Sequence, residues 1–226
     1  MDFPVPEAPR TLNCCAVLFD MDGTLVDSTP IVEQVWSEFA LRYDLDYAEI
    51  LRTSHGIQAI DTVRRFAPEG ADILTLTAEL GAMERVRTDG IVPLPGAAEL
   101  LHILPGDSVA LVTSADRILA DIRMEAAGLT MPATAITTDV ITRGKPHPQG
   151  YLRAAELLGV QPADALVFED APAGIAAGLA AGIRTVAVGP NTGALPDGVL
   201  HINDYSSVRV TVETDATGSR TISIRL

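Results

Sequence analysis

Two aspartates lie two residues apart directly after a short apolar run. The run covers residues 14–19, and Asp20-Met21-Asp22-Gly23 follows it. Successive side chains of an extended chain alternate in direction, so Asp20 and Asp22 project to the same side beyond the strand's end. Two carboxylates this close repel each other unless a divalent cation neutralises one and the other holds or shares a proton. Taken alone, the segment is more typical of an Asp-Gly turn, because turns are rich in both residues.

Three later segments carry polar residues that suit phosphate or a hard cation. Thr113 and Ser114 end an apolar run where a helical pattern opens, and free backbone N–H groups at a helix start favour a phosphate. Lys145 lies between residues that stop helices; alone, it is typical of a solvated surface charge. Glu169 and Asp170 end another apolar run before a second helical pattern. They could be helix caps or, at the end of a buried strand, ligands of a hard cation.

Short apolar runs alternate with helical patterns along most of the chain. Strands that alternate with helices of this length indicate βαβ crossovers and a mostly parallel sheet with both faces covered. The expected fold class is α/β, with a Rossmann-like three-layer core whose strand ends bring the polar segments to one edge. The predicted strands are residues 14–19, 108–113, 133–137, 165–168, 184–188 and, more weakly, 199–202, and the predicted helices are 96–104, 116–127, 148–158 and 172–181.

Residues 28–92 break this alternation. They show helical periodicity and no convincing strand, over a length that a compact domain does not leave as a loop. The segment predicts a helical insert with its own small core, connected through residues 26–28 and 92–96. Near the end of the chain, residues 208–212 and 221–224 alternate apolar and polar side chains, which predicts a C-terminal β-hairpin. The expected domains are a core of residues 12–27 and 93–210, the insert 28–92, and a C-terminal extension 211–226.

The composition excludes several classes of protein. The chain has 226 residues and 47% hydrophobic content, which is enough for one buried core of ordinary size. Sixteen basic against thirty acidic residues give a net charge of -14, which argues against nucleic-acid or anionic-lipid partners. No apolar run approaches the roughly 18 to 20 residues of a membrane span, and the opening residues lack signal-peptide features, so we expect a cytoplasmic protein. Cys14 and Cys15 are adjacent, and we expect both to be buried free thiols.

In this order and spacing, the four polar segments resemble the four motifs of the haloacid dehalogenase superfamily of phosphotransferases. The resemblance covers the chain from about residue 14 to residue 210. Thr53-Ser54-His55-Gly56, residues 144–148 and residues 168–178 are also similar to segments of the glycerol-3-phosphate and 2-deoxyglucose-6-phosphate phosphatases. Members of this group carry a helical cap inserted after the first strand, and residues 28–92 lie at that place.

The resemblance implies a covalent mechanism. Asp20 would be the nucleophile that takes the phosphoryl group as an aspartyl phosphate. Asp22 would protonate the departing oxygen and then deprotonate the water that hydrolyses the intermediate. Thr113 and the backbone of Ser114 would hold phosphate oxygens. Lys145 would balance the negative charge on the phosphoryl group and on Asp20.

The resemblance also implies Mg2+ as the cofactor. Its ligands would be the Asp20 carboxylate, the main-chain oxygen of Asp22 and Asp170, with Glu169 a direct or indirect ligand. A metal, a lysine and helix N-termini supply the positive charge that phosphoryl transfer requires. They would also let an acidic protein bind an anionic substrate.

The core motifs all converge on the phosphoryl group, so another segment must recognise the rest of the substrate. Residues 53–56 are the one polar, glycine-containing break between helical patterns of the insert, and Gln58 follows. We expect His55, Gly56 and Gln58 to lie at the substrate, with His55 and Gln58 bonded to its hydroxyl groups. A plain helix–helix turn capped by Ser54 is the alternative, since Ser and Gly are ordinary turn residues.

The function that these expectations favour is a Mg2+-dependent phosphatase of a small phosphorylated sugar or polyol. A β-phosphoglucomutase-type enzyme is the first alternative, because it uses the same four motifs but returns the phosphoryl group to the sugar. A non-catalytic binding module on the same scaffold is the second. A dehalogenase is disfavoured, since the departure of halide does not need an acid at Asp22. The expected partner is a small phosphorylated metabolite, and the expected state is a monomer or weak homodimer.

Overall fold

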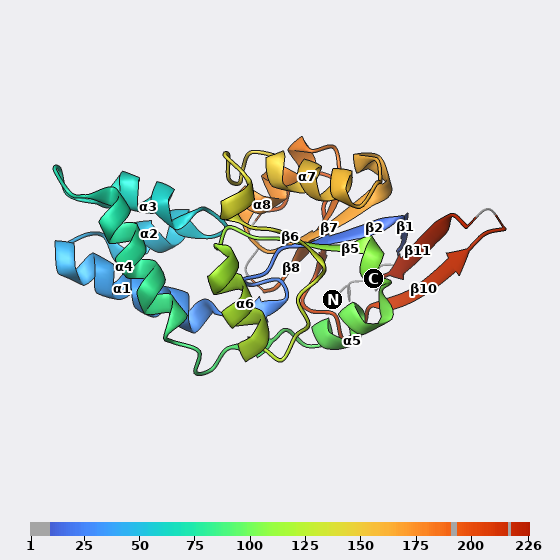
Figure 1. Cartoon of the computed structure of the whole chain (residues 1–226), viewed down its shortest axis with the longest axis horizontal. Helices are drawn as coiled ribbons and strands as arrows, with labels where there is room; N and C mark the ends of the chain where they lie inside the picture. The colour runs from blue at the N-terminus through green and yellow to red at the C-terminus, as the bar shows by residue number, and fades with distance from the viewer. Residues whose placement is uncertain (1–9, 191–193, 217) are drawn as a thin grey trace, which may run out of the picture.

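A computed structural model describes residues 10–190, 194–216 and 218–226, and its centre is a six-stranded parallel sheet (Figure 1). This sheet confirms the expected α/β fold class. Each predicted strand from residue 108 onward lies within a residue or two of an observed one. In spatial order the strands are β6 (Thr134–Ile136), β5 (Val109–Val112), β2 (Ala16–Phe19), β7 (Ala165–Glu169), β8 (Arg184–Val188) and β9 (Leu200–Ile202).

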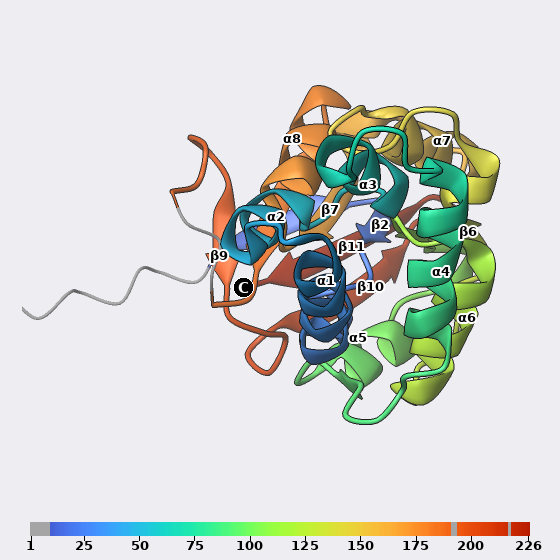
Figure 2. The same cartoon turned by 90° about the vertical axis from the view of Figure 1, so that its left-hand side faces the viewer.

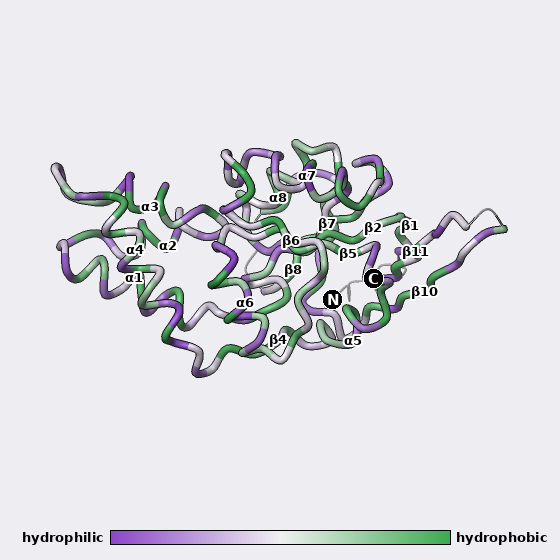
Figure 3. The backbone as a smooth tube through the Cα atoms, in the orientation of Figure 1, coloured by the Kyte–Doolittle hydropathy of each residue, from purple (hydrophilic) through white to green (hydrophobic). Residues whose placement is uncertain are grey.

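The register of the central strands places their carboxyl ends side by side. Phe19, the last residue of β2, pairs with Leu111 of β5 and with Phe168 of β7. Residues that follow these strands therefore meet at one edge of the sheet. The middle of the sheet is wholly buried, and Figure 3 shows that hydrophobic residues dominate its strands. The Phe19 and Phe168 rings stack with their centroids 5.3 Å apart.

Four helices cover the two faces of this sheet, which makes three layers. Buried side chains of β2 alternate between the faces: Leu18 packs with the cluster under α7 and α8, and Phe19 with the cluster under α5 and α6. Along the described residues, none of the helices combines the length and the apolar character that crossing a bilayer requires. The helices are α5 (Ala97–Ile103), α6 (Arg117–Ala126), α7 (Gln149–Leu157) and α8 (Pro172–Ala180), and short 3-10 turns lie at Gly106–Ser108, Thr138–Val140 and Pro162–Asp164.

The apolar run at residues 14–19 forms two strands rather than the predicted one. Residue 15 is the break, because its backbone N–H donates to the Asp164 carbonyl (2.7 Å) and turns the chain into the parallel sheet. Before it, β1 (Thr11–Cys14) pairs antiparallel with β11 (Arg220–Arg225). Cys14 is buried as expected, but Cys15 is only half-buried; both are free thiols.

The predicted C-terminal hairpin is formed by β10 (Arg209–Thr214) and β11, and it joins β1 in a second, three-stranded sheet. Ile222 and Ile224 of β11 are fully buried in the same cluster as Phe19. The hairpin is therefore packed onto the main core, although it adds no strand to the parallel sheet.

Residues between β2 and α5 form a helical insert with its own apolar cluster. Its helices are α1 (Thr29–Tyr43), α2 (Tyr47–Ser54), α3 (Ala59–Phe66) and α4 (Ile73–Arg85). The side chains of Trp36, Phe39, Ile50 and Val63 are central to this cluster. In Figure 2, the insert lies in front of the strand ends of the central sheet.

The two segments that connect the insert to the core pair with each other. They are the short strands β3 (Val26–Asp27) and β4 (Val92–Pro93), antiparallel, with Asp27 opposite Val92. The sequence predicts the connections at residues 26–28 and 92–96. It did not predict their pairing, because two-residue strands carry no readable alternation.

Candidate active site

The segment that follows β2 is both a turn and a cluster of acids. Asp20 is 5% exposed, and the turn after it is closed by the Gly23 N–H, which donates to the Val26 carbonyl (2.8 Å). Gly23 has φ +79°, and a Cβ built on it would lie 2.1 Å from an Asp170 carboxylate oxygen. Only glycine therefore lets the turn approach Asp170 this closely.

Lys145 is buried between two carboxylates and is not a solvated surface charge. It is 6% exposed; its Nζ donates to Asp20 Oδ1 and, at 2.6 Å, to Glu169 Oε1. Burial acts to lower the pKa of the ammonium, but Asp20 and Glu169 outweigh burial and hold the pKa above its ordinary value. Lys145 is therefore a fixed cation beside Asp20.

Both oxygens of Glu169 are occupied by protein groups. The Tyr151 hydroxyl donates to Oε1 (3.2 Å), which also accepts from Lys145, and the Ala171 N–H donates to Oε2 (2.8 Å). Glu169 has no exposed surface. Through these contacts Glu169 orients Lys145. This position favours the expected role of Glu169 as an indirect rather than a direct ligand of a metal.

The carboxylates at the sheet edge carry more negative charge than Lys145 can neutralise. Asp20, Glu169 and Asp170 each present an oxygen, and these oxygens lie within 4.8 Å of one another. Burial, helped by Glu169 and Asp22 and opposed by Lys145, raises the pKa of Asp20 to about 7. Burial, helped by Glu169 and Asp20 and opposed by Lys145, raises the pKa of Asp170 well above its usual range. A largely buried set of hard oxygen donors with surplus negative charge fits a divalent cation such as Mg2+.

Thr113 and Ser114 follow β5 at the same edge of the sheet. Thr113 is buried, and its Oγ1 accepts from the Ala115 N–H (3.1 Å). The Ser114 hydroxyl donates to the carbonyl of Gly56 in the insert (2.8 Å). The Ser114 side chain therefore contacts the insert, while the role expected for this residue rests on its backbone N–H.

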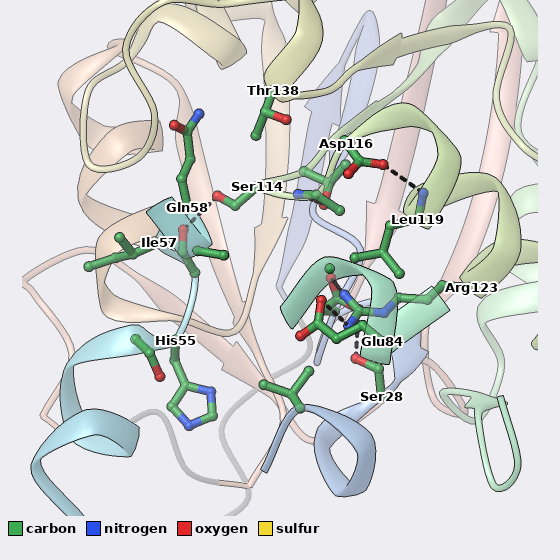
Figure 4. A pocket seen from close by; sticks show the side chains of 18 of the residues that line it. Ser28, His55, Ile57, Gln58, Glu84, Ser114, Asp116, Leu119, Arg123 and Thr138 are labelled. Carbon is green, nitrogen blue, oxygen red and sulfur yellow. Dashed lines mark hydrogen bonds and ion pairs between the residues drawn. The ribbon is translucent and has the colours of Figure 1, made fainter. Parts of the chain in front are cut away.

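The insert and the sheet edge enclose a cavity of about 410 Å³. Figure 4 shows His55 and Gln58 on one side of this cavity. Gly56 has φ +73°, and a Cβ on it would lie 2.6 Å from the Ala171 side chain. The predicted residues that line the cavity are Asp20, Asp22, Asp170, Thr113, Ser114, His55, Gly56 and Gln58; Lys145 and Glu169 are buried behind Asp20.

The sequence analysis missed Arg123, a buried residue of α6 whose Nη1 donates to Asp22 Oδ2 (2.8 Å). It also missed Glu84 of α4, which lies 3.5 Å from the same guanidinium. A signal was present, because Arg123 lies on the helix face that carries the buried Leu119, Ala120 and Met124. A charged residue inside an apolar helix stripe calls for a buried partner.

Gly174 of α8 provides a test of how Glu169 is packed. A Cβ built on Gly174 would lie 1.5 Å from Glu169 Oε1. Gly→Ala in a helix ordinarily stabilises by ~0.5–1 kcal/mol, but here we expect the overpacking to destabilise by ~1–3 kcal/mol or more. The measurement is urea unfolding followed by circular dichroism.

Gly81→Ala is the matched control for Gly174→Ala. Gly81 is a helix-interior glycine of α4, and the nearest atom to its built Cβ, Arg85 Nη1, lies at an ordinary 3.5 Å. We expect its free energy of unfolding to stay the same or rise. Equal stability of the two variants would contradict the described packing of Glu169.

Comparison with known proteins agrees with the family resemblance of the sequence motifs. Residues 16–182 match the family of haloacid dehalogenase-like hydrolases. Hexitol phosphatase A of Escherichia coli (strain K12) is 45% identical over 181 residues, which cover 78% of this chain and 84% of that protein. Glycerol-1-phosphate phosphohydrolase 1 of Saccharomyces cerevisiae is 33% identical over 196 residues, 82% of this chain and 78% of that protein.

Among solved structures, a β-phosphoglucomutase from Clostridium difficile superposes with a TM-score of 0.74. The match covers 85% of this chain and 92% of that one at 21% identity, so it shows a shared fold. The family match spans Asp20, Thr113, Lys145 and Asp170. The cluster at the sheet edge thus lies wholly within the matched region.

Proposed function

Because this chain belongs to the haloacid dehalogenase-like hydrolase family, we propose that it is a Mg2+-dependent phosphatase of a small phosphorylated sugar or polyol. The relatives named hexitol phosphatase and glycerol-1-phosphate phosphohydrolase support this substrate class. The observation that carries the proposal is the buried contact of Lys145 with Asp20, two residues before Asp22. A fixed cation beside one carboxylate, with a second carboxylate close by, suits nucleophilic attack on a phosphate ester.

In this proposal Asp20 attacks phosphorus and becomes an aspartyl phosphate. The bond from phosphorus to the sugar or polyol oxygen breaks, and Asp22 gives that oxygen a proton. Asp22 then takes a proton from the water that attacks the aspartyl phosphate and releases inorganic phosphate. Two adjacent carboxylates with separate surroundings can divide the nucleophilic and the proton-transfer roles.

The remaining groups hold the phosphoryl oxygens and the cation. Thr113 and the backbone of Ser114 bind phosphate oxygens beside the ammonium of Lys145. The Asp20 carboxylate, the Asp22 main-chain oxygen and Asp170 would hold Mg2+, which when bound adds positive charge at the transferring group. Glu169 keeps Lys145 in place and contributes indirectly.

We propose that residues 28–92 form a cap over the core of residues 12–27 and 93–210, with 211–226 as an extension. The separate apolar cluster of the insert supports this division. Contacts of the insert with the core, from the Ser114 hydroxyl to Gly56 and from Arg85 to Asp116, hold it over the cavity. His55, Gly56 and Gln58 then lie where the leaving group must be, and His55 and Gln58 bond its hydroxyls.

A panel of phosphate esters tests the proposal. With Mg2+ present, we expect inorganic phosphate to be released from hexitol, hexose and glycerol phosphates, with the highest kcat/KM for a sugar or polyol phosphate. β-Glucose 1-phosphate is included because a mutase would convert it to glucose 6-phosphate without releasing phosphate. That product would contradict the phosphatase assignment. A chain that neither hydrolyses nor isomerises any member would indicate a binding module.

A further inference from the structure

Arg123 connects Asp22 to the helical insert. Arg123 is 4% exposed; its Nη1 donates to Asp22 Oδ2 (2.8 Å), and its Nη2 lies 3.5 Å from Glu84 Oε2. Arg123 is part of α6 in the core, whereas Glu84 is part of α4 in the insert. Figure 4 shows Arg123, Glu84 and Ser28 gathered at one end of the cavity.

Both oxygens of Asp22 are held by these neighbours. Oδ2 accepts from Arg123, and Oδ1 accepts from the hydroxyl of Ser28 (2.6 Å), the residue that precedes α1. An aspartate held at both oxygens cannot rotate freely about its side-chain torsions, so its carboxyl is fixed in direction. Ser28, which donates to Oδ1, lies at the start of the insert, and Arg123, which donates to Oδ2, faces Glu84 of the insert.

Burial of Arg123 costs free energy that its contacts offset only in part. Its Nε and Nη2 make no hydrogen bond within the described residues, and a buried guanidinium with unused donors costs free energy. Burial acts to lower its pKa, but the Asp22 and Glu84 carboxylates hold the pKa above its ordinary value, so the group stays charged. An apolar residue would suit the Leu119 and Met124 face of α6 better if packing alone mattered.

We infer that Arg123 is a positioning residue that holds the Asp22 carboxyl in line with the leaving oxygen and, through Glu84, ties that orientation to the seating of the insert. The inference rests on the proposed phosphatase function. In the step concerned, the bond from Asp20 to phosphorus forms while the bond from phosphorus to the leaving oxygen breaks. The proton of Asp22 moves to that oxygen, which departs as a neutral alcohol.

The dependence of rate on the leaving group tests the inference. An alkoxide is a poor leaving group and needs the proton, whereas 2,4-dinitrophenolate leaves without one. For Arg123→Met we expect kcat/KM to fall ~100-fold on a hexitol 6-phosphate, the scale of a general-acid contribution, and to change less than ~3-fold on 2,4-dinitrophenyl phosphate. The ratio kcat/KM is used because it reports the steps up to the first cleavage, before hydrolysis of the phosphoenzyme.

Two further variants separate positioning from charge and from folding. Arg123→Met/Glu84→Gln removes one cation and one carboxylate, so the cluster keeps its net charge, and we expect the same selective loss. Arg117→Met is the control on the same helix, because Arg117 is exposed and pairs with Asp121; both of its rates should match the wild type. Inhibition by inorganic phosphate and the circular dichroism spectrum show whether each variant keeps its fold and its phosphate site.

Selective loss on the hexitol phosphate in both Arg123 variants supports the inference. Equal loss on the two substrates, no loss on either, or recovery in the double variant would each overturn it, while leaving the phosphatase assignment intact. If the wild type releases no phosphate from either ester, the proposed function itself fails.

Discussion

Asp20→Asn is expected to lower turnover of a polyol phosphate by ~10⁴-fold or more, the scale seen when a covalent nucleophile is removed. The amide keeps the shape of the side chain but has no carboxylate oxygen to attack phosphorus. Lys145 keeps its second partner, Glu169, at 2.6 Å, so the ammonium should stay in place. Release of inorganic phosphate under single-turnover and steady-state conditions measures the loss.

The same variant should fold at least as well as the wild type. Because burial raises the pKa of Asp20 to about 7, the folded state binds this proton more tightly than the unfolded chain does. Ionised Asp20 therefore costs stability, and this cost grows as the pH rises from about 4 to 7. At pH 8 in chelator, the unfolding midpoint of Asp20→Asn should not lie below that of the wild type.

Asp121→Asn, at an exposed position of α6, is the control for the amide substitution and should retain full turnover. Near-normal turnover in Asp20→Asn would contradict the covalent mechanism. If Asp20→Asn is inactive because it does not fold, the expectation that ionised Asp20 costs stability is wrong.

Removal of divalent cations is the second large effect that we expect. EDTA should lower activity by ~10³-fold or more, since an ion at the transferring group contributes several kcal/mol. Mg2+ should restore activity, whereas Ca2+ should inhibit, because it prefers more ligands at longer distances. The acids that we expect to hold this cation are Asp20 and Asp170, whose pKa values are raised by burial and by neighbouring carboxylates.

A thermal measurement separates binding of the cation from catalysis. Mg2+ should raise the unfolding midpoint of the wild type, because a ligand that binds only the folded state stabilises it. Asp170→Ala should shift less at the same Mg2+ concentration and need more Mg2+ for activity. Asp121→Ala, away from the cluster, should respond as the wild type does. Full activity in chelator, or an equal shift in Asp170→Ala, would refute the cation site.

Much of the fold could be predicted because most helices and strands have a recognisable local pattern of apolar and polar residues. Strands of a parallel sheet buried on both faces are apolar throughout, and the run at residues 165–168 needs no knowledge of its neighbours to be recognised. The break at Cys15 could not be predicted, because the side chains on both sides of it are apolar. Only the pairing partners, Ile222 across from Cys14 and Ala165 across from Ala16, distinguish the two strands.

The candidate site shows a similar division. Strand ends direct Asp20, Thr113 and Asp170 to one edge, so topology alone brings them together. Lys145 alone is typical of a surface charge, because its partner Asp20 is 125 residues away in the sequence. Arg123 was not predicted, because the pattern at strand ends says nothing about helix faces, although Arg123 lies in an apolar stripe of α6. The Glu84 contact depends on how the insert sits, which no local pattern encodes.

The paired connections β3 and β4 have a consequence for how such a protein can change. Asp27 and Val92 lie opposite each other, so the polypeptide leaves the core and returns to it at neighbouring points. A two-residue turn is enough to join antiparallel strands at that spacing. The whole segment from residue 28 to residue 91 is therefore exchangeable as one contiguous cassette, with the order and register of the sheet untouched. A single replacement in the gene could give this core a new selectivity, provided that the new segment again supplies partners for Asp22 and Arg123 in place of Ser28 and Glu84.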